Sequence, residues 1–176
     1  MVATLLTVGH GTLTHEELTA LLHGAGVREV VDVRRFPGSR RHPHVARDAL
    51  EASLPAAGIA YRWEPRLGGR RSQAKGDADT DPWWQVAAFR AYASYARGDE
   101  FREALASLLD DAQVPGVVVM CSEAVWWRCH RRIISDVAVL LHGATVRHLM
   151  HDGRLTEHPP AAGARVTAHG VVYDAQ

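Results

Sequence analysis

The chain has 176 residues, 20 basic and 20 acidic side chains, and an apolar content of 47%. The length suits a single domain over residues 1–176, and the apolar content excludes a largely disordered chain. A formal net charge of zero excludes whole-molecule attraction to nucleic acid or to an anionic membrane. The chain shows no signal-peptide pattern and no apolar run of membrane-spanning length, and it has only two cysteines. We therefore expect a cytoplasmic location and no membrane partner.

Strand and helix patterns alternate along the first part of the chain. Thr14 is a candidate N-cap, and Glu17 completes a capping box for the helix that follows. A strand, a helix and a strand this close together indicate a βαβ unit with parallel strands. The predicted elements are a strand at 4–8, a helix ending at Gly24, a strand at 27–33, a helix at 45–57 and a strand at 59–63.

The second part begins with a long polar loop, predicted from 65 to 81, a length that is typical of functional or mobile segments. Asp99 is a candidate N-cap, and Gly143 stands where a helix C-terminus is expected. The pattern predicts an α/β fold with a mainly parallel sheet of about five strands flanked by helices. Its elements here are helices at 82–97 and 99–111, a strand at 116–120, a helix after Trp126, a strand at 145–149 and a short strand at 171–173.

The stretch from Cys121 to Arg132 follows the most apolar strand and holds two Cys, one Glu, one His and three Arg. Ligands bind at the carboxyl ends of strands in open α/β sheets. We expect Cys121 to lie just before a helix N-terminus, which would lower its thiol pKa and make it a nucleophile or a metal ligand. The alternative for Cys121 is a buried small residue. Glu123 is the best candidate for a general acid or base, with a capping or salt-bridging role as its alternative.

Parallel strands would bring other polar residues to the same edge of the sheet. This edge is expected to gather His10, Arg34 with Arg35, Cys121, Glu123 and His130. Residues 28–71 contain ten Arg against five acidic residues, which predicts a local positive field there. The loop Gly68-Gly69-Arg70-Arg71 is flexible and cationic and would close over a phosphate.

The residues around Cys129 allow more than one arrangement. Because sequence neighbours on a helix point in different directions, Cys129 is expected to face the core and His130 or Arg131 the site. Alternatively, Cys121, Cys129, His130 and His10 bind zinc or iron, although their spacing is not that of a zinc knuckle. The spacing from Cys121 to Arg128 is a poor match to a phosphatase or rhodanese loop. The aromatic run that includes Tyr92 favours core packing over base stacking.

Motifs spread over residues 7–159 resemble the bacterial and archaeal family called domain of unknown function 488. They are Thr7-Val-Gly-His-Gly11, Val31-Asp-Val-Arg34, Pro37 with Ser39-Arg40, Leu67-Gly-Gly69, Tyr92, Met120-Cys-Ser-Glu123, Cys129-His-Arg131, and Arg147-His148 with Asp152-Gly153 and His158. The resemblance implies a Rossmann-like α/β domain, with residues 160–176 as a tail. It also implies a polar signature made of His10, Asp32, Arg34, Cys121, Glu123, Cys129, His130 and Arg131.

Two positions depart from the family pattern: Gly11 replaces a usual Ser or Thr, and Val125-Trp126 replaces an acidic residue and a Pro. The family name states that the function is unknown, so the resemblance carries no biochemical activity over to this chain.

The leading hypothesis is a possible hydrolase that acts on a phosphate-bearing small molecule or nucleic acid. Glu123 and His10 would perform acid–base chemistry, with Cys121 as a possible nucleophile. Phosphodiester and N-glycosidic bonds are the bonds to test. Candidate ligand contacts are Arg34, Arg40, Arg70, Arg131, His130 and Tyr92. The alternatives are a non-catalytic nucleotide or nucleic-acid binding module and a Cys/His metal protein; the sequence leaves the oligomeric state open.

Overall fold

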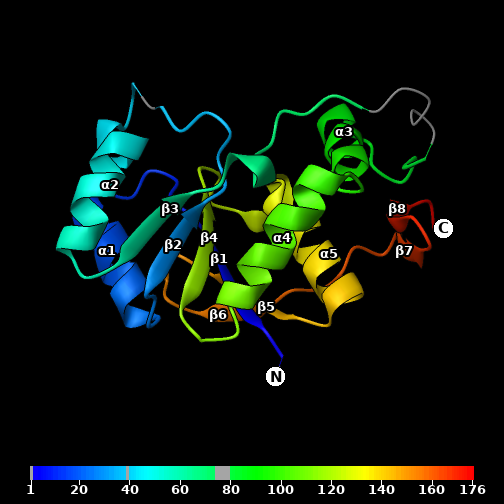
Figure 1. Ribbon diagram of the computed structural model, residues 1–176. Coiled ribbons are helices and arrows are strands. Elements are labelled where there is room, and N and C mark those ends of the chain that lie inside the picture. The colour runs from blue at the N-terminus through cyan, green and yellow to red at the C-terminus, as the bar shows by residue number, and fades with distance from the viewer. Residues whose placement is uncertain (1, 39, 74–79) are drawn as a thin grey trace.

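The computed structural model describes residues 2–38, 40–73 and 80–176. In these residues six strands form one sheet in the order β3-β2-β4-β1-β5-β6 (Figure 1). Neighbouring strands from β3 to β5 are parallel, and β6 is antiparallel to β5. The predicted α/β fold with a mainly parallel sheet is therefore confirmed, with one strand more than expected. The strands are β1 Thr4–Gly9, β2 Glu29–Asp32, β3 Ala60–Trp63, β4 Val117–Cys121, β5 Thr145–Leu149 and β6 Leu155–Glu157.

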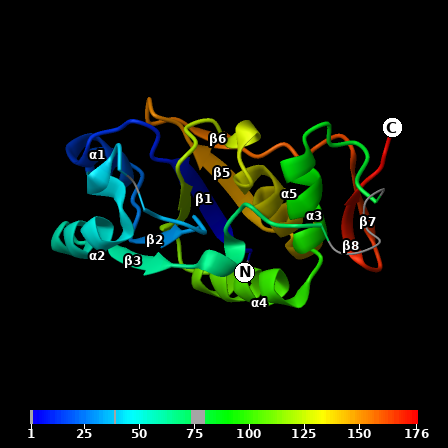
Figure 2. The same ribbon diagram turned by 90° about the horizontal axis from the view of Figure 1, so that it is seen from above.

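Helices cover both faces of this sheet, as in a Rossmann-like domain (Figure 1). The helices α1 and α2 lie on one face, and α4 and α5 lie on the other. A separate hairpin, β7 with β8, packs beside α3 and α5 at the far end of the molecule (Figure 2). The bounds are α1 His15–Gly24, α2 Arg47–Ala56, α3 Ala87–Tyr95, α4 Asp99–Asp111, α5 Arg131–His142, β7 Ala164–Thr167 and β8 Gly170–Tyr173.

The central strand β4 is buried along its whole length because both of its faces are covered. Val117 and Val119 belong to the apolar cluster that includes α4 and α5, whereas Val118 and Met120 belong to the cluster that includes α1 and α2. The alternation follows from the two-residue period of a strand. It explains why this strand reads as a continuous apolar run in the sequence.

Two helix boundaries follow the sequence signals closely. Thr14 caps α1 as predicted: its Oγ1 accepts from the Glu17 N–H at 3.1 Å, and the Glu17 carboxylate accepts from the Thr14 N–H at 2.9 Å. Gly143 ends α5 in the left-handed conformation with φ +64°, which a residue without a Cβ adopts at no steric cost.

The helix predicted at 82–97 is shorter, because α3 begins only at Ala87. The preceding segment is held by the C-terminal hairpin instead. Trp84 packs against the Tyr173 ring with centroids 5.0 Å apart, and Asp81 accepts from the Tyr173 N–H at 3.1 Å. These tertiary contacts outweigh local helix propensity.

Three further expectations change in the structure. Asp99 is the first residue of α4, and Gly98 occupies the N-cap position. The long loop at 65–81 starts with a 3-10 turn at Pro65–Leu67, and its residues 74–79 lie outside the described residues. After β4 the chain forms a short 3-10 turn at Trp126–Arg128, so that α5 starts at Arg131. The helix N-terminus therefore lies next to Cys129 and not next to Cys121.

Candidate functional site

The site lies where β1 and β4 end side by side. Gly9 pairs with Cys121 across these two strands, and Asp32 at the end of β2 pairs with Met120. The chain leaves β1 toward α1 on one face of the sheet and leaves β4 toward α5 on the other face. A crevice opens at such a divergence in α/β sheets. It forms a pocket of about 1090 Å³ here, and both the His10–Gly11–Thr12 and the Cys121–Glu123 segments border it.

Positive charge dominates the wall of this pocket. Six arginines line it, whereas Glu123 is the one carboxylate among the described lining residues. Arg40, Arg41 and Arg128 are exposed. Phe36 is 61% exposed, and the centre of its ring lies 5.2 Å from the Arg35 guanidinium carbon and 5.8 Å from that of Arg70. The lining arginines are Arg34, Arg35, Arg40, Arg41, Arg70 and Arg128.

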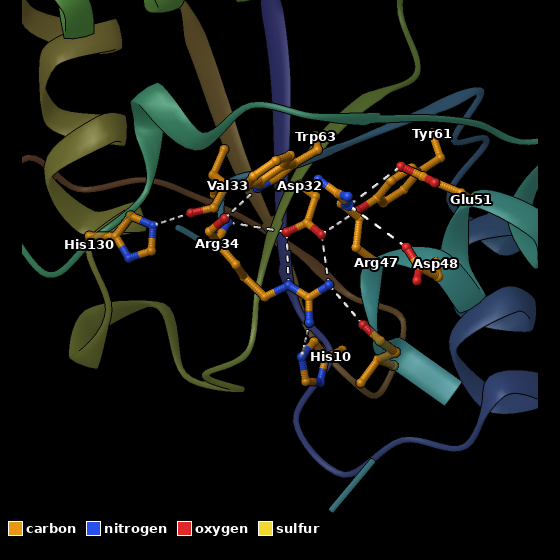
Figure 3. Close-up of polar contacts among 11 residues, drawn as sticks. His10, Asp32, Val33, Arg34, Arg47, Asp48, Glu51, Tyr61, Trp63 and His130 are labelled. Carbon is orange, nitrogen blue, oxygen red and sulfur yellow. Dashed lines mark hydrogen bonds and ion pairs between the residues drawn. The ribbon is translucent and has the colours of Figure 1, made fainter. Parts of the chain in front are cut away.

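Arg34 contributes to this wall but is tightly held from behind. Its Nε and Nη2 donate to the two oxygens of Asp32 at 2.8 and 2.7 Å, and Nη2 also donates to the Val45 carbonyl (Figure 3). The Tyr61 hydroxyl donates to the same carboxylate at 2.5 Å. Asp32 is fully buried, so this pair is shielded from solvent. The third nitrogen, Nη1, is the one that faces His10, at 3.4 Å from Nε2 (Figure 3).

His10 is held as a neutral ring. Burial lowers its pKa to about 4; the Arg34 charge acts in the same direction, against the hydrogen bond to Gly11. Nδ1 donates to the Gly11 carbonyl at 2.9 Å, which leaves the Nε2 lone pair toward Arg34. A ring with so low a pKa is a hydrogen-bond acceptor at neutral pH and a weak base.

Glu123 occupies an exposed position on the loop that follows β4. Its Oε1 accepts from the Val125 N–H at 3.4 Å, a long contact that leaves most of the carboxylate open to the pocket. The backbone at this point is packed tightly on β1, since an ideal Cβ on Gly9 would come within 1.7 Å of the Glu123 carbonyl oxygen. Gly9 therefore sets how closely this loop approaches the end of β1.

Cys121 does not lie at the start of a helix, contrary to the sequence prediction. The residue is 2% exposed, and burial raises its pKa well above the ordinary value, with its contact to Cys129 acting in the same direction. Arg131 Nε donates to the Cys121 sulfur at 2.9 Å, but the helix N-terminus that would favour a thiolate is elsewhere. Cys121 is therefore a buried thiol at the strand end.

Arg131 supports the pocket from inside and does not line it. It is 1% exposed; Nη1 donates to Thr7 Oγ1 at 3.1 Å, and Nη2 donates to the Glu123 carbonyl at 2.6 Å. Because Nε also donates to Cys121, the Arg131 guanidinium links β1, the end of β4 and the loop that carries Glu123. The structure corrects the expected ligand contact of Arg131 to an internal brace.

Cys129 and His130 stand at the start of α5 and line the pocket. Cys129 is 7% exposed and belongs to the core cluster, in line with the predicted core-facing position. His130 Nε2 donates to the Val33 carbonyl at 2.8 Å, and its Nδ1 lies 3.5 Å from the Cys129 sulfur (Figure 3 shows the first contact). The Tyr92 ring packs on His130 at 5.2 Å, while its hydroxyl donates to the Leu67 carbonyl.

The family model described as "Domain of unknown function DUF488" matches residues 14–138. The chain belongs to the DUF488 family. No curated protein and no solved structure gives a significant match. The matched region of this DUF488 protein contains Arg34, Cys121, Glu123 and Cys129, whereas His10 precedes it.

The structure of the DUF488 protein separates the predicted site residues into two groups. The pocket wall contains the candidates His10, Arg34, Arg40, Arg70, Tyr92, Cys121, Glu123 and His130. Arg131 lies behind it. Within the described part of the chain, no three His, Cys, Asp or Glu side chains are grouped so that they could hold a metal ion. The structure thus does not assemble the alternative zinc or iron ligand set of Cys121, Cys129, His130 and His10.

Sequence reasoning missed several lining residues of this DUF488 protein. Arg41 and Arg128 were visible only as members of arginine-rich stretches, and Phe36 only as part of a turn. His151 also lines the pocket and donates to the Gly9 carbonyl through Nε2 at 2.6 Å. A lone histidine in a turn carries no signal that distinguishes it from a surface residue.

A buried polar chain behind the pocket was also missed. Arg131 donates to Thr7, Thr7 Oγ1 lies 2.6 Å from His148 Nδ1, and His148 Nε2 lies 2.8 Å from His158 Nδ1. His158 Nε2 then donates to Asp136 at 2.6 Å, and the Tyr173 hydroxyl donates to the same carboxylate at 2.8 Å. This series of hydrogen bonds connects the site to the C-terminal hairpin.

Of the helices in the described residues, none is long and apolar enough to cross a membrane.

Proposed function

We propose that this DUF488 protein is an enzyme that binds a nucleotide in the arginine-lined pocket and hydrolyses one of its bonds. The observation that supports this most directly is the composition of the wall. Its described residues include six arginines and one carboxylate around a volume of about 1090 Å³. Guanidinium groups form charge-assisted, bidentate hydrogen bonds with phosphate oxygens. The neutral net charge of the whole chain makes this concentration a local property of the site.

The aromatic side chain of Phe36 favours a nucleotide over a bare phosphate. Its ring is exposed at the pocket and lies near the guanidinium groups of Arg35 and Arg70. An exposed ring of this kind offers a stacking surface for a base, a contact worth about 1–3 kcal/mol per base in single-strand binding proteins. The exposed Arg40, Arg41 and Arg128 would then hold the phosphate.

Glu123 is the group proposed for acid–base chemistry. It is the carboxylate of the described pocket wall, and it is exposed next to the ends of β1 and β4. A carboxylate beside a bound phosphodiester or N-glycosidic bond can activate a water molecule or protonate the leaving group. His10 would assist as a neutral hydrogen-bond acceptor, because burial keeps its pKa at about 4.

Binding is tested first, by titrating the protein with nucleoside mono- and diphosphates and following tryptophan fluorescence or heat. Arg40→Gln and Arg128→Gln should each weaken binding about tenfold, which corresponds to ~1.4 kcal/mol. Arg147→Gln is the matched control, because Arg147 is exposed on β5 and absent from the pocket wall. Affinity should fall as salt rises. Failure of every nucleotide to bind, or equal losses in the control, would overturn the proposal.

Hydrolysis is tested with the same nucleotides by chromatography of the products. Glu123→Gln should retain nucleotide binding and lose turnover by at least a hundredfold. Glu157→Gln is the control, since Glu157 is an exposed carboxylate on β6 outside the pocket wall. If the parent binds nucleotides tightly but converts none of the panel, the protein is a non-catalytic nucleotide-binding module instead.

A further inference from the structure

The two cysteines of the chain meet at the floor of the pocket. Cys121 ends β4 and Cys129 stands at the start of α5, and their sulfurs are 2.8 Å apart. Both residues line the pocket and both are free thiols. A disulfide bond has a length of about 2.05 Å, so the two sulfurs need to move less than about 1 Å to bond. The arrangement suits reversible conversion between two thiols and one disulfide.

The environments of the two sulfurs differ. The first N–H of α5, that of Arg131, donates to the Cys129 sulfur at 3.4 Å, so this sulfur sits at the positive end of a twelve-residue helix. His130 Nδ1 lies 3.5 Å away, and because His130 Nε2 donates to the Val33 carbonyl, a proton on Nδ1 makes the ring a cation. Such surroundings favour a thiolate.

The Arg131 guanidinium contacts Cys121, with Nε 2.9 Å from that sulfur, whereas the helix N–H and His130 act on Cys129. Burial alone would raise the pKa of Cys129, but the Cys121 hydrogen bond and the charges of His130 and Arg131 bring it well below the ordinary value. Burial likewise opposes the charged form of His130, yet the Cys129 charge raises the pKa of that ring. Tyr92 packs on His130, and its hydroxyl donates a hydrogen bond to the Leu67 carbonyl.

We propose that Cys129 and Cys121 form a redox-active dithiol that reduces low-molecular-weight disulfides bearing carboxylates. Cys129 is the attacking thiolate, because it is the sulfur at the helix end, and Cys121 is the resolving thiol. The arginine wall attracts the carboxylates of the substrate into the pocket. This proposal rests on the sulfur geometry and is independent of nucleotide binding.

The reaction proceeds in two exchange steps. The Cys129 thiolate attacks one sulfur of the substrate, forms a mixed disulfide and releases the first thiolate, which takes the His130 proton. The Cys121 sulfur then attacks Cys129, forms the internal disulfide and releases the second thiolate, which takes the Cys121 proton. Two electrons pass from the protein dithiol to the substrate disulfide, which leaves as two thiols.

The direct test is a redox titration of the whole protein in mixtures of oxidised and reduced glutathione. Remaining thiols are alkylated and counted by intact mass, which is unambiguous because the chain has two cysteines. The expected result is conversion between a doubly alkylated form and an unalkylated disulfide form, which is two hydrogen atoms lighter than the unmodified dithiol protein. The singly glutathionylated form should be a minor species. Two thiols that stay alkylatable in a large excess of oxidised glutathione would overturn the proposal.

Single variants distinguish the two roles. Cys121→Ser should accumulate the mixed disulfide on Cys129, and Cys129→Ser should react with oxidised glutathione at least tenfold more slowly. Peptide mapping of the wild-type protein after brief alkylation gives the same information without a variant, with Cys129 labelled first. Preferential labelling of Cys121 would refute the assigned order.

The substrate class is tested with hydroxyethyl disulfide, which has no charge. It should react more slowly than oxidised glutathione, and the difference should shrink at high salt. Equal rates for the two disulfides at low salt would refute the role of the arginine wall. They would not affect the proposal that the two cysteines form a redox-active dithiol. Nucleotide binding is also measured on the Cys129→Ser protein. A failure of the dithiol proposal is thereby distinguished from a failure of the nucleotide proposal.

Discussion

Acid should destabilise the protein through two buried histidines, His10 and His148. Burial and the Arg34 charge lower the pKa of His10 to about 4, and burial with the His158 and Arg131 charges lowers the pKa of His148 to about 3. In the unfolded chain both rings have a pKa of about 6.5. Between pH 6.5 and pH 4 the unfolded state therefore binds protons that the folded state does not.

The size of the effect follows from proton linkage. Each ring lowers the free energy of unfolding by about 1.4 kcal/mol per pH unit below pH 6.5, which amounts to about 2 kcal/mol per ring at pH 5. The contribution is fully present above pH 6.5 and is lost as the pH falls toward the folded pKa. His130 acts outside this window, because its raised pKa alters stability only above pH 6.5.

The assay is urea unfolding at pH 7, 6 and 5, followed by the fluorescence of the five tryptophans. Between pH 7 and pH 5 the free energy of unfolding of His10→Gln should fall by about 2 kcal/mol less than that of the parent. This difference is expected whatever the stability of the variant at pH 7. His169→Gln is the control, because His169 is exposed in the β7–β8 turn, and it should follow the parent. Equal losses in His10→Gln and the parent would mean that folded His10 is protonated, and the argument from burial would fail.

Three further substitutions test single features of the fold by the same unfolding assay at pH 7. Arg131→Met should lower the free energy of unfolding by about 3 kcal/mol because it removes the donors to Thr7 and to the Glu123 carbonyl; a loss under 1 kcal/mol would argue against the bracing role. Gly9→Ala should cost about 2 kcal/mol or more, since its Cβ meets the Glu123 carbonyl, and an unchanged midpoint would contradict this packing. Thr14→Ala should cost about 1 kcal/mol by removing the N-cap of α1, and no change would mean that the capping box does not contribute.

Local signals in the sequence were sufficient for much of the fold. The Thr14 cap, the Gly143 helix end and the apolar run of β4 each depend on neighbours within a few positions, so the sequence predicted them correctly. The strand at 145–149 was predicted at the observed bounds of β5. The parallel order of strands also brought His10 and Cys121 to one edge of the sheet, as expected.

Contacts between distant segments overrode these local signals elsewhere. The helix predicted from residue 82 starts at Ala87, because Asp81 and Trp84 are held by Tyr173 of the C-terminal hairpin. The chain from His148 to Asp136 also needs partners far apart in sequence. Such contacts leave no periodicity or spacing in the sequence from which they could be predicted.

The sequence by itself determined that the chain is an α/β protein with a polar, arginine-rich edge, because strand and helix patterns and residue composition are local properties. Only the tertiary structure decided which of these groups face the pocket and in what chemical state. Arg131 became a buried brace because three of its nitrogens found partners inside the fold. The helix N-terminus that favours a thiolate came to lie at Cys129, because the chain forms a 3-10 turn before α5 begins. Charge state depends on burial and on neighbours in space, and packing alone sets both.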